Sequence, residues 1–240
     1  MSDVTAQRPT KEAVLRRLKQ CGLDVTDVFD VGVMFQTEEL RVVYADVRQH
    51  LFEPVTNFHD RIVELYDGLD FVLVPKAVGA SDGTTTLLQR TLSDDLEVTH
   101  SRIETDGARP RQPSEQETTI EAIRLDSYLA GLTPQDRSIL LKIDVDGNEP
   151  EVLQGATETL QQTTAVIIET QLTNFSERNA FLEDAGFALH DLCDLCYYGG
   201  MLTQFDAVYL RKDLTMHTAF NPFAAHEPFD QSIWKKYPPQ

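Results

Sequence analysis

Short apolar runs rich in Val, Ile and Phe alternate with helix-like segments over most of this 240-residue chain. These runs are VTDVFDVGV, HLFEP, FVLVPKAV, ILLKIDV and AVIIET. Such an alternation is typical of βαβ units, in which helices cover the faces of a sheet of parallel strands. The last two runs are interpreted as fully buried central strands. The pattern therefore predicts an α/β fold with a mostly parallel sheet.

The segments between the runs carry helix signals. Helices are expected in TEELRVVYADV, NFHDRIVELYDG and PEVLQGATETLQQ. Pro150 suits the first position of a helix, and Gly68 suits the position just after a helix ends. A further helix is expected in SERNAFLEDAGF. Two strand-like runs around Gly199 and Gly200 follow it, and they predict an antiparallel hairpin at the sheet edge.

The length of the chain predicts a single domain over residues 1–240, because α/β domains of roughly 200–250 residues are common. Residues 79–119 differ from their surroundings, since polar and apolar side chains alternate there before a polar segment, ARPRQPSEQ. We predict a β-rich insertion that forms a lid over a cofactor cleft, with this polar segment as its mobile part. Residues 213–240 form a C-terminal tail rich in Phe and Pro.

The chain is strongly acidic, with 21 basic and 39 acidic side chains and a formal net charge of −18. Nucleic-acid-binding proteins gain affinity by neutralising phosphates with clustered Lys and Arg, so we expect no nucleic-acid partner. No apolar stretch approaches the roughly 20 residues of a membrane span, and the first residues lack the apolar core of a signal peptide. We therefore expect a cytoplasmic protein with no membrane span.

Three cysteines cannot build a disulfide framework. Cys193 and Cys196 form a C-x-x-C pair, but the sequence offers no second pair of Cys or His ligands to complete a zinc site. A metal or redox role for this pair is not expected.

Acidic residues stand where several predicted strands end. The first strand ends at Asp30-Val31-Gly32, the second at Glu53-Pro54 and the fourth at Asp144. In an open parallel sheet the ligand lies beyond the carboxyl ends of the strands. Glu53 follows Asp30 by roughly 20 residues, the offset at which a carboxylate reaches the two hydroxyls of a ribose. The first turn lacks the glycines of G-x-G-x-x-G, which disfavours a pyrophosphate and an NAD-linked oxidoreductase.

The run LLKIDVDGNEPEVLQGATETL, followed by AVIIET, resembles the hallmark segment of the FkbM-type methyltransferases. The segment 123–129 and the motifs FDVG, FEP and KAVGASDG stand in the order that this family shows. The resemblance implies a Rossmann-like methyltransferase fold with a seven-stranded sheet. It also implies transfer of a methyl group from S-adenosylmethionine to an oxygen, here a sugar hydroxyl of a glycan or glycosylated metabolite. The partner would be a small-molecule or glycan acceptor.

The resemblance implies roles for individual residues. Asp30 and Gly32 would lie near the methionine part of the cofactor, and Glu53 would bind the ribose. The full set of cofactor-binding residues implied is Asp30, Gly32, Glu53, Pro54, Ala77, Val78 and Asp144, with Ala77 and Val78 beside the adenine. Met34 and Gln36 replace an Asn and a Gly that family members commonly carry. The alternative is therefore a non-catalytic interaction module with a degenerate cofactor loop.

Methyl transfer to a hydroxyl requires that the acceptor be aligned and lose its proton. Asp144 and Glu169 end strands that we expect to be neighbours. Their carboxylates could act as a general base, or hold a divalent cation such as magnesium that lowers the pKa of the hydroxyl. Lys142 supplies a local counter-charge, which favours the metal-free route. His190 is a second candidate base. The sequence leaves open the acceptor, the metal requirement and the oligomeric state.

Overall fold

The computed structural model of the chain describes residues 9–90, 100–103, 116–221 and 228–234. The chain forms two compact units. One unit comprises residues 25–169, and the other comprises residues 1–24 together with 170–240. The single domain over residues 1–240 stays a prediction.

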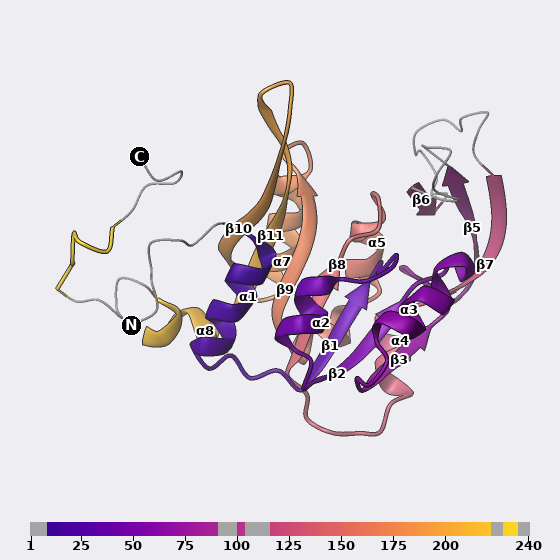
Figure 1. Ribbon diagram of the computed structural model, residues 1–240, viewed down its shortest axis with the longest axis horizontal. Coiled ribbons are helices and arrows are strands. Elements are labelled where there is room, and N and C mark those ends of the chain that lie inside the picture. Colours follow the sequence, from indigo (N-terminus) through magenta and orange to yellow (C-terminus); the bar gives the residue numbers. More distant parts are fainter. Residues whose placement is uncertain (1–8, 91–99, 104–115, 222–227, 235–240) are drawn as a thin grey trace. The chain divides into compact units, whose positions relative to one another are not determined.

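The main sheet contains parallel strands and one antiparallel hairpin. Its strands are β1 (Asp27–Val31), β2 (Arg48–Phe52), β3 (Phe71–Val74), β8 (Ile139–Ile143), β9 (Thr163–Gln171), β10 (Phe187–Tyr198) and β11 (Met201–Arg211). The strand order is β10-β11-β9-β8-β1-β2-β3 (Figure 1). Strands β3, β2, β1, β8 and β9 pair in parallel, whereas β10 and β11 are antiparallel. This order confirms the predicted mostly parallel seven-stranded sheet with an antiparallel edge hairpin.

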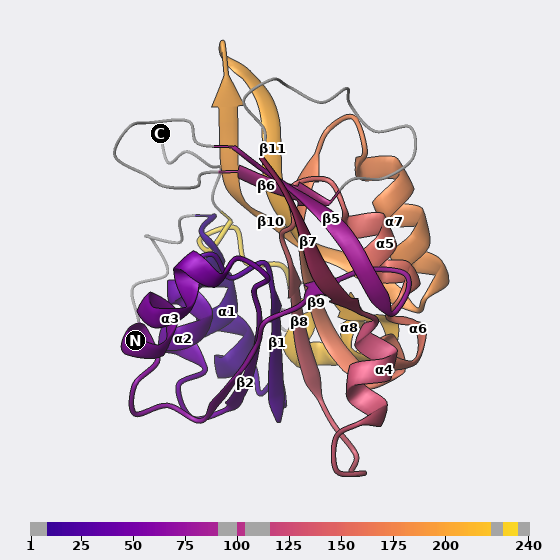
Figure 2. The same cartoon turned by 90° about the vertical axis from the view of Figure 1, so that its right-hand side faces the viewer.

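Helices cover both faces of the sheet in the unit of residues 25–169. These helices are α2 (Glu38–Val43), the 3-10 turn η2 (Thr56–Phe58), α3 (His59–Leu65), α4 (Leu125–Ala130), α5 (Glu149–Gln154) and α6 (Thr157–Gln161). Figures 1 and 2 show α2 and α3 on one face of β1 and β2, with α4 and α5 on the other. Burial on both faces explains why β1 and β8 are buried along their whole length.

One predicted helix is divided in two at Gly155. A Cβ built on Gly155 would lie 2.1 Å from the carbonyl oxygen of Gly79, so only a glycine permits this approach of the two backbones. The chain therefore passes from α5 to α6 with a break, where the sequence pattern predicted one continuous helix.

A second, smaller sheet follows the third strand of the main sheet. It is built from β4 (Ala77–Val78), β5 (Gly83–Arg90), β6 (His100–Ile103) and β7 (Gln116–Ile123), in the order β4-β7-β5-β6 (Figure 2). The segment predicted as an insertion is thus rich in strands, and its last strand extends to Ile123. Nearly all of the predicted mobile segment, ARPRQPSEQ, lies outside the described residues. Leu87 of β5 packs in one hydrophobic cluster with Phe58, Ile62 and Tyr66.

Asp126, within the segment that carried part of the family resemblance, caps a helix from outside. Its Oδ1 accepts hydrogen bonds from the backbone N–H groups of Glu158 (3.0 Å) and Thr159 (2.8 Å). These N–H groups lie in the first turn of α6, where the helix itself offers no acceptor. The Ala156 side chain at the N-cap makes no such bond. Asp126 is therefore assigned a structural role.

The other unit contains α1 (Lys11–Gln20), α7 (Phe175–Asp184), α8 (Lys212–Thr215), the 3-10 turn η3 (Thr218–Phe220) and the β10–β11 hairpin. The sequence pattern predicted α7 and the hairpin but not α1. The sequence signal for α1 is Thr10, a residue type that often caps the start of a helix. In the structure, its side chain accepts a hydrogen bond from the Ala13 N–H. None of the described helices is long and apolar enough to cross a membrane.

Candidate active site

A cavity of about 260 Å³ lies where β1, β2 and β8 end. Six of the residues predicted to bind a cofactor line it: Gly32, Glu53, Pro54, Ala77, Val78 and Asp144. The structure therefore brings together residues from three strand ends and from β4, as expected for the carboxyl edge of a parallel sheet. The sequence pattern did not predict the wall contributed by η2 and by β5 and β6 of the second sheet, which consists of Phe58, Leu87, Ser101 and Ile103.

Glu53 follows β2 and is held by two backbone hydrogen bonds. Its side chain is buried, and its two oxygens accept hydrogen bonds from the backbone N–H groups of Met34 (2.7 Å) and Val55 (2.8 Å). Burial raises the pKa of Glu53 to about 7, while these two N–H groups and Lys142 oppose the shift and Asp30 adds to it. Each oxygen keeps a further lone pair, so the carboxylate can still accept from a ligand hydroxyl.

Gly32 allows the first loop to pass very close to the end of β8. Its φ is +86°, and a Cβ at this position would lie 1.8 Å from the carbonyl oxygen of Asp144. No side chain fits in that space, and the left-handed conformation also favours glycine. Gly32 thus lets the backbones beside the cavity approach each other.

Lys142 links two acidic side chains at this edge of the sheet. Its Nζ lies 3.3 Å from Oδ1 of Asp30 and 3.5 Å from Oδ2 of Asp144, and it donates to the Gly32 carbonyl oxygen at 2.7 Å. Lys142 and Asp30 are buried, whereas the Asp144 side chain is 36% exposed. A buried charge is stabilised only when it is paired, and here one ammonium group serves both acids. The counter-charge predicted for Asp144 is therefore present.

Met34 adopts a conformation that its side chain disfavours. Its φ is +55°, and the side chain is 38% exposed at the cavity. We expect Met34→Asn to raise the free energy of unfolding by about 0.5–1 kcal/mol, because Asn tolerates the left-handed region better than Met and little packing is lost. Urea titration measures the change. A lower unfolding free energy would show that Met34 contributes packing that outweighs the strain.

Two predicted catalytic residues, Glu169 and His190, are not among the described residues that line the cavity. Glu169 lies in β9, one residue after the pairing of Ile143 with Ile168, and it does not occur among the described residues that line the cavity. His190 lies on β10, in the other unit. Burial and then the charge of Arg17 lower the pKa of His190. Catalytic roles for Glu169 and His190 stay predictions.

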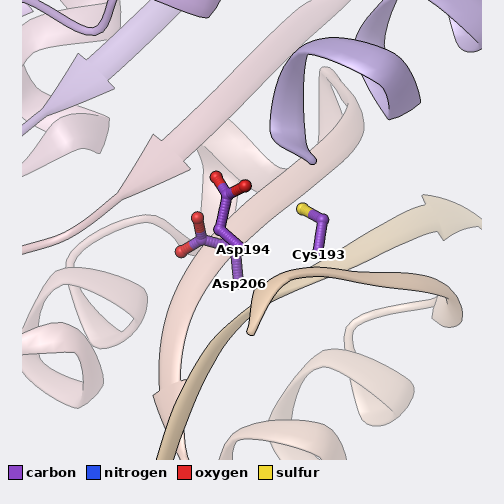
Figure 3. Close-up of side chains that lie close together, drawn as sticks. All are labelled: Cys193, Asp194 and Asp206. Atoms are coloured by element: carbon purple, nitrogen blue, oxygen red, sulfur yellow. The ribbon is translucent and has the colours of Figure 1, made fainter. Parts of the chain in front are cut away.

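A separate cluster on the hairpin joins Cys193, Asp194 and Asp206 (Figure 3). Their ligand atoms lie within 4.8 Å of one another, the spacing of a metal site. The ammonium of Lys11 lies 2.8 Å from Asp206 and 3.7 Å from Asp194, so it supplies the positive charge. Burial, together with both aspartates, raises the pKa of the Cys193 thiol, and a protonated thiol is a poor metal ligand. We assign this cluster a structural role.

The parallel sheet with its antiparallel edge hairpin defines a Rossmann-like fold, and the acid-lined cavity lies at its carboxyl edge, where such folds bind ligands. A sequence profile of the Methyltransferase FkbM domain matches residues 21–189. The chain belongs to the FkbM methyltransferase family.

The chain is similar to a curated protein and to solved structures. It is 31% identical over 160 residues to the hexuronic acid methyltransferase AglP of Haloferax volcanii. The match covers 66% of this chain and 62% of AglP, which is less than two thirds of that relative.

Two solved structures align with this chain at 10% sequence identity. Magnesium protoporphyrin IX methyltransferase from Synechocystis PCC 6803, with bound SAM, has a TM-score of 0.46 and is matched over 84% of this chain and 77% of its own. SMU.1697c from Streptococcus mutans, in complex with SAH, has a TM-score of 0.47 and is matched over 86% of this chain and 99% of its own. The assignment of the fold rests on this chain's own strand order, and the assignment of the family rests on the profile match.

Proposed function

We propose that this protein is an S-adenosylmethionine-dependent O-methyltransferase that acts on a sugar hydroxyl of a glycan or glycosylated metabolite. The charge of the cavity carries the proposal. Glu53, Asp144 and Asp146 line it, and among the described lining residues only Lys76 is basic. Such a cavity attracts the sulfonium and ammonium groups of S-adenosylmethionine and repels the pyrophosphate of NAD. The hexuronic acid named for AglP supports a sugar as acceptor.

The residues of the cavity fit the parts of this cofactor. Glu53 offers two carboxylate oxygens to the ribose hydroxyls. The apolar side chains of Pro54, Val78 and Leu87 suit the flat faces of an adenine. Gly32 lines the cavity beside Asp144, where the methionine part would lie. When bound, S-adenosylmethionine supplies an electrophilic methyl group.

Asp144 is the proposed proton acceptor. It lines the cavity and is partly exposed, so its carboxylate can reach an acceptor hydroxyl there. Lys142 holds it by an ion pair and so fixes its position. Because this ammonium already supplies a positive charge beside Asp144, we favour a route without a divalent cation. In the metal-assisted alternative, Asp144 and Glu169 would hold magnesium.

A non-catalytic role is the second candidate, because Met34 and Gln36 depart from the family pattern. The structure offers one observation against complete degeneration of the loop. The Met34 N–H still donates to Glu53, and any residue except proline can supply that backbone group. Cofactor binding separates the two candidates.

Isothermal titration calorimetry tests the proposal through Glu53. We expect S-adenosylmethionine and its demethylated product to bind and NAD not to bind. Because Glu53 has a pKa of about 7, it is mostly ionised at pH 8 and mostly protonated at pH 6. Only the ionised form offers both oxygens as acceptors, so the dissociation constant should rise about tenfold from pH 8 to pH 6.

Glu53→Gln is the matched variant for this titration. Its amide nitrogen cannot accept a hydrogen bond, so binding should weaken at both pH values and the difference between them should disappear. A wild-type affinity in this variant would remove Glu53 from the site. Transfer of a labelled methyl group to a hexuronic acid, compared with a neutral hexose, tests the acceptor class. Cofactor binding without transfer to any sugar would favour another acceptor.

A further inference from the structure

The end of the β10–β11 hairpin exposes apolar side chains that the proposed function does not use. Tyr197, Tyr198 and Met201 are 62%, 81% and 71% exposed. Tyr198 pairs with Met201, and Tyr197 pairs with Leu202. Successive residues of a strand point to opposite faces, so this ribbon presents one apolar pair on each face. We call residues 195–204 the hairpin tip.

The hairpin tip is a preformed structure. Gly199 and Gly200 form a two-residue connection between the paired residues Tyr198 and Met201, and their φ angles are +58° and +81°. Positive φ at both positions is the signature of a type I′ turn, whose twist matches that of the flanking strands. Figure 1 shows β10 and β11 running together up to this turn. The exposed side chains are therefore held on a defined ribbon.

The hairpin tip is also neutral in a strongly acidic chain. Its sequence, LCYYGGMLTQ, contains no charged residue, whereas 25% of the whole chain is charged and the net charge is −18. Two copies of this chain repel each other over most of their surfaces, and the repulsion is least where charge is absent. β10 is the edge strand of its sheet, but its pairing with β11 is irregular between Cys193 and Tyr197, and the Asp194 N–H donates to the Pro9 carbonyl oxygen. The exposed side chains of the tip, rather than the strand edge, are therefore what a second copy can cover.

We infer that the hairpin tip is a self-association surface that binds a second copy of this chain across a two-fold axis. A two-fold interface brings the same patch of both copies together, so it must complement itself. A neutral apolar ribbon meets this requirement. Packing of one tip against the other covers the exposed side chains of Tyr197, Tyr198 and Met201 in both copies.

The size of the surface sets the expected affinity. The tip offers ten residues, whereas a standard interface uses about 20–30 residues on each side. We therefore expect a dimer that dissociates at concentrations on the order of micromolar.

Sedimentation velocity of the full chain over roughly 1–100 µM tests the inference. The wild-type protein should shift from monomer to dimer over this range. Tyr198→Ser combined with Met201→Ser should raise the dissociation constant at least tenfold, with an unchanged circular dichroism spectrum because both side chains are exposed. Met216→Ser is the control, since Met216 is 84% exposed outside the tip and should leave the dimer intact.

Cross-linking through Cys196 gives a second measurement. Cys196 is exposed in the tip and Cys193 is buried, so a short bismaleimide in a Cys21→Ser background should link two copies through Cys196. The same tip substitutions should abolish this product. A wild-type protein that stays monomeric at the highest concentration overturns the inference. So does a dimer that the tip substitutions leave unchanged, or a monomer whose tip binds neutral lipid vesicles or an oligosaccharide instead.

Discussion

Asp144→Asn should lower the turnover of methyl transfer by about 10²–10⁴-fold while leaving the fold intact. A general base contributes rate enhancements of this size, and an amide cannot accept the proton of the acceptor hydroxyl. The fold should survive because the Asp144 side chain is 36% exposed. The buried Lys142 also keeps Asp30 as its partner, at 3.3 Å. Single-turnover assays with a hexuronic acid acceptor measure the loss of turnover. Calorimetric titration of S-adenosylmethionine measures whether the folded site still binds the cofactor.

The matched control is Asp146→Asn. Asp146 lines the same cavity and has a φ of +52°, a conformation that Asn tolerates. We expect this variant to lower turnover by less than about tenfold, because it removes a nearby charge but not the proton acceptor. Near-normal turnover in Asp144→Asn would remove Asp144 from the mechanism. Equal losses in the two variants would show that only the charge of the cavity matters.

The same assay distinguishes the two routes to the acceptor oxygen. In the metal-free route that we favour, a chelator leaves turnover of the wild-type protein unchanged, since Lys142 already supplies the positive charge beside Asp144. Loss of turnover in chelator, with recovery on addition of magnesium, would assign Asp144 to a metal site.

The strand-end residues of the site could be predicted because topology places them. Parallel strands bring their carboxyl ends to one edge, so Gly32, Glu53 and Asp144 converge although they are far apart in sequence. The central strands were also recognisable, since β1 and β8 are mainly apolar and are buried along their whole length. The α/β class and the edge of the sheet that carries the cavity therefore follow from these patterns, whereas the methyltransferase fold and its cofactor were implied by the family resemblance.

The remaining walls of the cavity depend on contacts with no local signal. Leu87 and Ile103 reach the cavity through the pairing of β5 with β6. The sequence of neither strand indicates that these two residues pair with each other. The buried network of Asp27, His50 and Arg137 is a second example, because Arg137 lies 110 residues from Asp27. Burial alone would raise the pKa of Asp27, but hydrogen bonds from His50, Thr26 and Arg137 outweigh it and hold the pKa at about 2. Asp27 and His50 stand in strand-forming runs and Arg137 stands in a polar loop, so the sequence alone does not show that they are partners.

Gly32→Ala should destabilise the protein by about 3 kcal/mol or more and abolish cofactor binding. The added Cβ would lie 1.8 Å from the Asp144 carbonyl oxygen, so the first loop and the end of β8 must separate. That separation would also break the hydrogen bond from Lys142 to Gly32 and displace the ion pairs with Asp30 and Asp144. Urea titration measures the free energy of unfolding, and calorimetry measures the affinity for S-adenosylmethionine.

Gly68→Ala separates this steric effect from backbone strain. Gly68 has a φ of +82°, nearly the value of Gly32, but a Cβ there meets nothing within 4 Å. It should therefore cost only the strain of a left-handed residue, about 1–2 kcal/mol, and leave cofactor affinity unchanged. The excess cost in Gly32→Ala is then attributable to contact with the Asp144 backbone. If the two variants lose the same stability and both bind S-adenosylmethionine normally, the close approach at Gly32 has no part in shaping the cofactor site.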